Sequence, residues 1–243
     1  MLSSKEKERY NRQLLIEDLG IEGQERLKKS KVFIAGAGGL GSPISIYLGA
    51  AGVGTLKIVD QDIISLSNMN RQILYNSIDI GRKKAYVAKE KLEALNPEIK
   101  VEVVSKTITK DNIFEFIDGV DLIMDAMDNF PARYILNDAA FEKNIPFIYG
   151  GVYGLEGALT TMIPGKTVCL RCIVNDAPSE STPPVLGSAP GVIGCLQSIE
   201  AIKYLSGVGS LLKNRLMIFD GFNMRFREVK LSPDLRCSVC AQK

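Results

Sequence analysis

The chain has 243 residues, of which 46% are hydrophobic and 24% charged, proportions typical of a globular protein that buries an α/β core. Its formal net charge of +2 provides no basic excess for binding nucleic acid or an anionic membrane. The absence of histidine excludes a Ser-His-Asp triad, HExxH zinc chemistry and any imidazole base.

The beginning of the chain shows no targeting signal. Residues 1–12 are charged and lack the apolar stretch of a secretory signal. The most apolar helical stretch, 44–53, is much shorter than the roughly 20 residues that span a bilayer. We therefore expect a cytoplasmic protein. A helix is predicted over 4–19, ending near Gly20, and the positive charges in 26–31 are interpreted as a solvated helix end.

A βαβ unit follows. The apolar run 31–35 predicts a buried strand, 40–51 predicts a helix, and 55–59 predicts a second strand that closes on Asp60. The unit spans about 30 residues, the usual size for a pair of parallel strands joined by a helix.

Strands and helices continue to alternate up to Gly150. Helices are expected at 81–95, near 110–117 and after Asp128-Asn129, where Pro131 fits the first turn, and strands at 99–104, 121–125 and 145–149. This alternation predicts an α/β fold with a doubly wound, mostly parallel, Rossmann-like sheet.

The rhythm changes after Gly150. We expect a strand pair or bent strand at 151–163, a loop at 173–190, a helix at 192–205 and strands at 215–220 and 224–231. We interpret the chain as one domain over 1–243, in which a core (1–150) carries a smaller C-terminal strand and helix elaboration (151–243).

A glycine-rich turn joins the first predicted strand to its helix. Gly36, Gly38 and Gly41 match the G-x-G-x-x-G pattern, within the run GAGGLG that also contains Gly39. Such a turn presents backbone N–H groups and the positive end of a helix dipole to phosphate. Asp60, at the end of the next strand, is placed to accept ribose hydroxyls. Together these features predict a nucleotide site, whereas the glycines alone would also fit tight helix–strand packing.

The residues after Asp60 indicate which nucleotide binds. A polar stretch, 65–72, is followed by Gly81-Arg82-Lys83-Lys84. Arg71 and Lys84 are candidates for a cationic clamp on a triphosphate, although each taken singly also fits a solvated surface charge. Asp128, after the strand ending at Asp125, is a candidate magnesium ligand or a helix N-cap, and both roles are compatible.

Four of the five cysteines form two CxxC pairs, Cys169/Cys172 and Cys237/Cys240. Two such pairs predict a closed, structural four-thiolate zinc site that fastens the tail to the domain body. Disulfides and a redox CxxC are the weaker alternatives in a cytosolic chain without a thioredoxin-like unit. The fifth cysteine, Cys195, lies at the apolar start of a helix, where a packed side chain is favoured over a reactive thiol.

Together these motifs resemble the MoeB/ThiF/HesA family, which is related to ubiquitin-activating enzymes. The resemblance covers nearly the whole chain in order. Its features are the segments 9–13, GAGGLG at 36–41, 59–60 and SNMNRQ at 67–72, then Lys84, Asp128-Asn129, both CxxC pairs, 196–201 and 225–228.

The resemblance implies an adenylyltransferase that uses ATP, magnesium and zinc and acts on a small β-grasp sulfur carrier ending in Gly-Gly, in molybdopterin, thiamine or related biosynthesis. It places the ATP ribose at Asp60 and magnesium at Asp128. The loop 173–190 would clamp the carrier's tail. Arg12 would reach the γ-phosphate of a neighbouring subunit, which implies a homodimer. The residues expected to contact the phosphates are Asn68, Arg71, Gln72 and Lys84.

The chemistry of adenylation suits a chain without histidine, and the absence of a cysteine from the loop limits which further steps this chain can perform. The carrier's carboxylate is an anion at neutral pH, so its attack on the α-phosphorus needs no general base. No cysteine occurs between 173 and 194, which argues against a persulfide or thioester step on this chain. No rhodanese-like extension follows Lys243, so we expect sulfur to come from another protein.

Two other classes of function remain open from the sequence. An NAD(P)- or FAD-dependent oxidoreductase would explain the glycine-rich turn and Asp60. A catalytically silent scaffold that binds a carrier would not need the four residues expected to be catalytic, which are Arg12, Arg71, Lys84 and Asp128.

Overall fold

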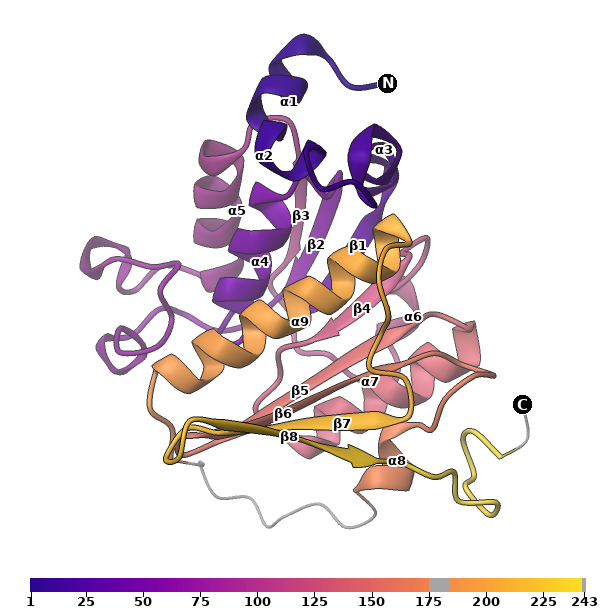
Figure 1. The fold of residues 1–243 in the computed structure, drawn as a ribbon. Coiled ribbons are helices and arrows are strands. Elements are labelled where there is room, and N and C mark those ends of the chain that lie inside the picture. Colours follow the sequence, from indigo (N-terminus) through magenta and orange to yellow (C-terminus); the bar gives the residue numbers. More distant parts are fainter. Residues whose placement is uncertain (175–183, 242–243) are drawn as a thin grey trace.

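The computed structural model describes residues 1–174 and 184–241, which form one eight-stranded sheet with helices on both faces (Figure 1). The strand order is β3-β2-β1-β4-β5-β6-β7-β8. The strands are β1 (Lys31–Ala35), β2 (Thr55–Val59), β3 (Lys100–Val104), β4 (Leu122–Asp125), β5 (Phe147–Tyr153), β6 (Glu156–Met162), β7 (Arg215–Asp220) and β8 (Arg225–Lys230).

The first five strands run parallel, and β1 and β4, at the centre of the sheet, are buried on both faces. Successive side chains of a strand point to opposite faces of the sheet. In β1, accordingly, Val32 and Ile34 join one apolar cluster, and Phe33 and Ala35 join the other. Parallel strands that are covered by helices on both faces have continuous apolar sequences, so the sequence pattern predicted them. The predicted doubly wound, mostly parallel sheet is confirmed.

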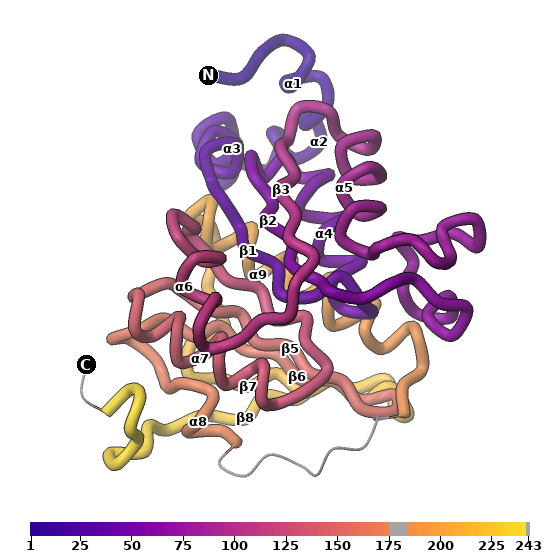
Figure 2. The backbone as a smooth tube through the Cα atoms, turned by 180° about the vertical axis from the view of Figure 1, so that it is seen from behind, coloured from indigo at the N-terminus to yellow at the C-terminus, as the bar shows by residue number. Residues whose placement is uncertain are grey.

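Helices cover the two faces in two layers. Figure 1 shows α4 and α9 crossing the front of the sheet, and Figure 2, from behind, shows α6 and α7 on the opposite face. The front cluster also draws on α3 and α5. The helices are α1 (Ser4–Arg9), α2 (Asn11–Leu14), α3 (Gly20–Lys29), α4 (Gly41–Ala50), α5 (Lys84–Leu95), α6 (Ile113–Phe116), α7 (Phe130–Lys143), α8 (Leu170–Ile173) and α9 (Ser188–Ser206), with 3-10 turns at Leu66–Asn68 and Ser77–Asp79.

The C-terminal strands continue the same sheet. β5 pairs with β4 in parallel and with β6 antiparallel, and β7 and β8 add two more antiparallel strands. The segment 151–163 is therefore the end of β5, a turn and β6. No helix within the described residues has both the length and the apolar character that a bilayer span requires.

The start of the chain differs from the sequence prediction. Instead of one helix over 4–19, α1 ends at Arg9, and the short α2 follows after Tyr10. Tyr10 is buried, and its hydroxyl accepts a hydrogen bond of 2.9 Å from the Asn96 side chain. This contact with a residue 86 positions away fixes the chain at a kink that local periodicity cannot predict. Of the positive residues in 26–31, Arg26, Lys28 and Lys29 lie in the last turn of α3, as predicted, whereas Lys31 begins β1.

Candidate nucleotide site and four-cysteine cluster

The glycine-rich turn leaves β1 at the point where the strand order reverses. β2 and β3 lie on one side of β1 and β4 lies on the other, so the ligand crevice of a doubly wound sheet is expected beyond the carboxyl ends of these strands. Gly36 has φ +99°, and a Cβ there would lie 2.7 Å from the carbonyl oxygen of Ala126. A Cβ on Gly41 would lie 2.1 Å from the Gly36 carbonyl oxygen. Both positions therefore require glycine.

Asp60 lies directly beside this turn. Its Oδ2 accepts a hydrogen bond of 2.8 Å from the Ala37 N–H, and its Oδ1 accepts one of 2.8 Å from the Asp62 N–H. Burial raises the pKa of Asp60, and the nearby Lys84 ammonium partly offsets that rise. Each carboxylate oxygen keeps a further lone pair, so Asp60 can still accept hydrogen bonds from ribose hydroxyls.

The polar stretch 65–75 packs against the turn. The Tyr75 hydroxyl donates to the Ala37 carbonyl oxygen at 2.9 Å. Gln72 is buried, its Oε1 has no hydrogen-bond partner, and its Nε2 lies 3.5 Å from where a Cβ on Gly38 would stand. The Asn68 side chain accepts from the Ser65 N–H at 3.0 Å and so closes a 3-10 turn.

The two predicted cations approach from different elements. The Cδ of Arg71 lies 3.6 Å from the position of a Cβ on Gly39, and its guanidinium donates to the Ser67 carbonyl oxygen at 2.9 Å. Lys84, the first residue of α5, is buried and forms a salt bridge of 2.8 Å with Asp62. Both cations thus lie near the turn and are held by protein acceptors.

Asp128 lies in the turn after β4. Asn129, not Asp128, caps α7, because its Oδ1 accepts a hydrogen bond of 3.0 Å from the Ala132 N–H. Asp128 is exposed and contacts the Asn129 amide at 3.2 Å. Its carboxylate is therefore available at the carboxyl end of β4, next to the glycine-rich turn.

Arg12 does not join the other candidates. It is exposed on α2, and its neighbour Gln13 donates to the Ala51 carbonyl oxygen at 2.9 Å, at the C-terminal end of α4. The glycine-rich turn lies at the opposite end of α4, about 15 Å away along a ten-residue helix. Arg12 of one chain therefore lies far from the crevice of that chain.

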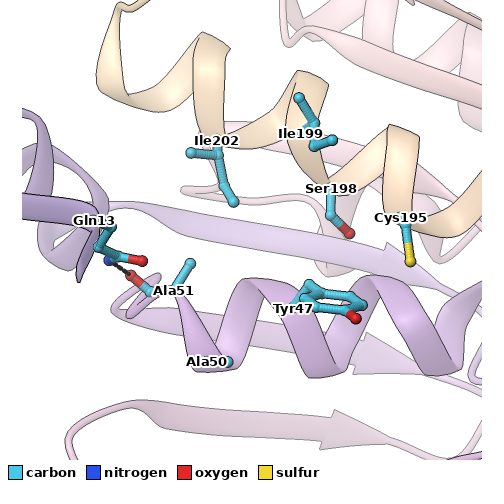
Figure 3. Close-up of a pocket in the computed structure, with 8 residues that line it drawn as sticks. All are labelled: Gln13, Tyr47, Ala50, Ala51, Cys195, Ser198, Ile199 and Ile202. Carbon is cyan, nitrogen blue, oxygen red and sulfur yellow. Dashed lines mark hydrogen bonds between the residues drawn. The ribbon is translucent and has the colours of Figure 1, made fainter. Parts of the chain in front are cut away.

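A groove of about 320 Å³ is lined by residues of α4 and α9, which pack against each other (Figure 3). Figure 3 shows Tyr47 on α4 facing Cys195 and Ser198 on α9, with Gln13 at one end. Burial raises the pKa of the Cys195 thiol, and a hydrogen bond with Tyr47 partly offsets this rise. A raised pKa disfavours the thiolate, the reactive form of cysteine.

The four cysteines of the CxxC pairs converge. Their sulfur atoms all lie within 4.8 Å of one another, with 3.5 Å between Cys169 and Cys237 and 3.3 Å between Cys172 and Cys240. A zinc ion with Zn–S bonds of about 2.3 Å needs tetrahedral edges of about 3.8 Å, which these separations bracket. The cluster therefore fits a four-thiolate zinc site.

Local interactions position this cluster. The Asn137 side chain of α7 accepts from the Leu170 N–H at 2.8 Å, which fixes the first CxxC pair. Burial and the neighbouring thiols raise the pKa of Cys169 and Cys240. At Cys237, by contrast, the effect of burial is outweighed by hydrogen bonds from the backbone N–H groups of Cys240 and Val239, which lower its pKa to about 7. A bound zinc ion would hold the four sulfur atoms as thiolates, so its binding would release protons.

The loop predicted over 173–190 lies partly outside the described residues, at 175–183. Its last part returns to the crevice. The Gly154 N–H donates to the Pro184 carbonyl oxygen at 2.7 Å, and a Cβ on Gly187 would lie 2.0 Å from the Asn70 carbonyl oxygen. α9 begins at Ser188, earlier than the predicted 192. Its Pro190 lies 3.3 Å from the point where a Cβ on Gly39 would stand, so α9 begins against the glycine-rich turn.

Residues 10–239 match the model of the ThiF family. The chain belongs to the ThiF family. The resemblance inferred from the motifs is therefore confirmed.

Relatives of this ThiF-family chain carry related names. The SAMP-activating enzyme E1 of Haloferax volcanii is 40% identical, over 99% of this chain and 91% of its own length. The sulfur carrier protein adenylyltransferase of Thermus thermophilus is 38% identical, over 99% and 93%. The adenylyltransferase and sulfurtransferase MOCS3-1 of Zea mays is 42% identical, and this chain spans 52% of its length.

A solved structure shares the fold. The crystal structure of E. coli MccB with MccA-N7isoASN superposes with a TM-score of 0.88 at 24% identity, over 98% of this chain and 75% of that one. The likeness supports the ThiF-type sheet with its C-terminal strands.

Sequence reasoning missed a buried group behind Asp128. Asp125 is fully buried and forms an ion pair of 3.2 Å with Arg133 of α7, and Gln197 of α9 donates to the Asp125 carbonyl oxygen at 2.8 Å. One signal was present in the sequence. Arg133 lies three, four and seven positions before Leu136, Asn137 and Ala140, and therefore on the same buried face of α7. A buried guanidinium needs an acidic or hydrogen-bonding partner in the protein interior.

Proposed function

We propose that this chain uses ATP to adenylate the C-terminal carboxylate of a small ubiquitin-like sulfur-carrier protein, with release of pyrophosphate. The proposal rests on family membership and on relatives named as adenylyltransferases or activating enzymes across more than 90% of both chains. The structural observation that supports it is the position of Arg71, Lys84 and Asp128, all near a glycine-rich turn that suits phosphate.

This arrangement supports adenylation over the redox alternative. A nicotinamide or flavin site needs the glycine-rich turn and Asp60 but has no use for two cations and a free carboxylate at the same crevice. A triphosphate needs them, because its negative charge must be neutralised as pyrophosphate leaves.

ATP would lie across the crevice with its ribose at Asp60. The backbone of 36–41 would face the phosphates, and Gln72, whose buried Oε1 lacks a hydrogen-bond partner, would reorient its amide toward them. Asn68 would contact the phosphates from the same stretch. Lys84 would exchange its salt bridge with the exposed Asp62 for the phosphates, which carry more charge.

Magnesium fits Asp128 because this carboxylate is exposed and is not used as the helix N-cap. The ion keeps mostly water and phosphate ligands, so one protein carboxylate suffices. When bound, it would neutralise phosphate charge and favour departure of pyrophosphate.

The reaction needs alignment more than proton transfer. The carrier's carboxylate oxygen attacks the α-phosphorus, the bond between the α-phosphorus and the bridging oxygen breaks, and pyrophosphate carries away the electron pair. Since the nucleophile is already an anion, a chain without histidine can perform this step. Arg71 and Lys84 stabilise the charge that develops on the leaving group.

We propose a homodimer with shared sites, because Arg12 lies far from its own crevice. The elements around the α4–α9 groove expose large apolar side chains, including Leu15, Ile16, Tyr47 and Ile199. Exposed apolar patches of this kind mark association surfaces. A second copy packed there would bring its own Arg12 toward the γ-phosphate.

Three further assignments complete the proposal. Zinc bound by Cys169, Cys172, Cys237 and Cys240 is structural, because four thiolates leave no position for substrate. The chain acts as one domain, in which residues 151–243 contact the carrier. The enzyme works in the cytoplasm, where its thiols stay reduced.

The test is ATP–pyrophosphate exchange. Exchange should occur only when a β-grasp protein ending in Gly-Gly is added, and a carrier truncated by its last glycine is the matched control. No exchange across a panel of such carriers, with a preparation that binds ATP, would discard the proposed reaction. Reduction of a flavin or nicotinamide by the same preparation would favour the redox alternative.

A further inference from the structure

The ladder between β4 and β5 ends before the strands do. Only two pairs join them, Ile123 with Phe147 and Met124 with Ile148. β4 nevertheless continues to Asp125, and β5 continues to Tyr153. The carboxyl ends of these two strands, beside the crevice, are therefore joined by something other than backbone pairing.

Two side chains from opposite faces of the sheet join these ends. From α9, the Gln197 amide donates to the carbonyl oxygens of Asp125 at 2.8 Å and Ile148 at 3.3 Å. From α7, the Arg133 guanidinium donates to the carbonyl oxygens of Met127 at 2.7 Å and Gly150 at 3.1 Å. A Cβ on Gly150 would lie 2.3 Å from the Gln197 side chain, so this closure depends on glycine.

Arg133 and Asp125 together hold one residue, Met127. The Asp125 Oδ1 accepts a hydrogen bond of 3.0 Å from the Met127 N–H, and Arg133 binds the Met127 carbonyl oxygen. The guanidinium is itself fixed between the rings of Phe130 and Tyr149, at 5.0 and 5.4 Å from their centroids. Both backbone polar groups of Met127 are thus set by one buried ion pair.

The residue after Met127 is Asp128. Because the Met127 carbonyl group belongs to the peptide unit that begins Asp128, fixing it fixes the N and Cα atoms from which the Asp128 side chain leaves the turn. A buried ion pair is a poor way to gain stability, since apolar side chains of similar volume often serve as well. Its retention directly behind an exposed carboxylate points to a geometric role.

We propose that Arg133 and Asp125 are positioning residues that aim the Asp128 carboxylate at the magnesium–nucleotide complex. This inference rests on the proposed function, which assigns Asp128 to magnesium. Arg133 touches neither metal nor nucleotide and acts through the backbone of Met127. Its planar, forked guanidinium reaches two carbonyl groups and a carboxylate at once, which a lysine ammonium does not reproduce.

The test measures how much magnesium tightens ATP binding, by calorimetric titration of the intact protein with and without magnesium chloride. Arg133→Lys keeps the positive charge and loses the planar guanidinium. It should lower the ratio of ATP affinity with magnesium to ATP affinity without it by about tenfold, while ATP affinity without metal changes less than about twofold. Arg82→Lys is the control, because Arg82 also faces a buried carboxylate, that of Asp79 at 3.5 Å. It should keep the wild-type ratio.

Two further arms make the outcome decisive. In an Asp128→Asn background, Arg133→Lys should cause no further loss, because both changes act on one contact. Asp125→Asn keeps the size of the side chain and should also weaken the effect of magnesium on ATP binding, by less than Arg133→Lys does. This variant tests the inference if Arg133→Lys does not fold.

If Arg133→Lys folds and magnesium tightens its ATP binding as much as in the wild type, the inference is overturned and the proposed function is unaffected. Equal losses in the wild-type and Asp128→Asn backgrounds would do the same. A wild-type protein whose ATP affinity does not respond to magnesium would overturn the proposed role of Asp128, and the inference with it.

Discussion

The four-cysteine cluster and the nucleotide crevice are assembled to different degrees. In the cluster, two segments 68 residues apart bring all four sulfur atoms within 4.8 Å, and nothing more is needed to surround a metal. In the crevice, the backbone of 36–41 is set by required glycines, but the charged groups are held elsewhere. Lys84 is paired with Asp62, and Arg12 lies at the far end of α4.

The difference follows from what each site must do. A structural metal stays bound, so its ligands can converge permanently and exclude solvent. A catalytic site must admit ATP and a carrier and release pyrophosphate, so its cations are better held by partners that they can leave. The cluster depends on one chain alone, whereas we expect the crevice to be completed by its substrates and by a second chain.

Removal of a crevice cation should have the largest effect. Arg71→Ala should lower carrier-dependent ATP–pyrophosphate exchange by about 100-fold or more, because charge on the leaving group loses a stabilising donor. The melting temperature should change little, since the Arg71 side chain bonds only to Ser67 and Asn70 among the residues that the structure describes. Lys83→Ala is the control, because Lys83 is exposed and its side chain donates to the Gln61 carbonyl oxygen alone within the described ranges. Wild-type exchange in Arg71→Ala would remove this residue from the site.

Mixing two inactive variants tests whether the crevice is completed by a second chain. In the proposed homodimer, Arg12→Ala and Arg71→Ala should each inactivate both sites. After subunit exchange of a 1:1 mixture, about one quarter of wild-type exchange should return, because half the dimers then carry one intact site. An affinity tag on one variant, with recovery of the untagged variant on the same resin, shows that mixed dimers have formed. An inactive mixture whose subunits have exchanged would place Arg12 in the site of its own chain.

Loss of a cysteine should affect the other region selectively. Cys240→Ser should lose zinc, expected near one ion per chain in the wild type, and lower the melting temperature by about 5 °C or more. ATP affinity should change much less, because no cysteine of the cluster contacts the crevice within the described residues. Elemental analysis, thermal unfolding and ATP titration check the three statements, and Cys195→Ser, outside the cluster, should retain zinc. A fresh wild-type preparation without zinc would refute the assignment.

The smallest effect concerns pH. Burial raises the pKa of Asp125 to about 6, with Arg133 offsetting part of the rise. A carboxyl group with a raised pKa in the folded state contributes stability that is complete below its unfolded pKa, near 3.8, and is lost as pH rises through about 6. The stability of the wild type relative to Asp125→Asn should therefore increase as pH falls from 7 to 5, as measured by denaturant unfolding. A difference independent of pH would show that Asp125 stays ionised throughout.

Features that depend on residues close together in the sequence were predicted, and features that depend on distant residues were not. Buried parallel strands such as Lys31–Ala35 are read as apolar runs, and the glycine-rich turn and CxxC pairs carry their chemistry within a few residues. The kink at Tyr10 instead depends on Asn96, 86 positions away, and α9 begins before Pro190, which the helix accommodates in its first turn.

The candidate site shows the same division. Asp60 and Asp128 were predicted because each comes after a strand, Lys84 because it lies at the start of a helix, and Arg71 because it lies in the polar stretch 65–72. The Asp125–Arg133 pair was missed as a unit, because its role depends on where the ladder between β4 and β5 stops. No local pattern encodes that point, although the charge of Arg133 on a buried helical face was a visible anomaly.

The uninterrupted sheet has a consequence for how the two regions respond to heat. β5 is hydrogen-bonded on one edge to the strands that end at the crevice and on the other to β6, which leads toward the first CxxC pair. Neither half can melt without exposing an edge of the other, so unfolding should be cooperative across the chain. A nucleotide held at one end would then delay the release of zinc from the other, with no contact between the two ligands.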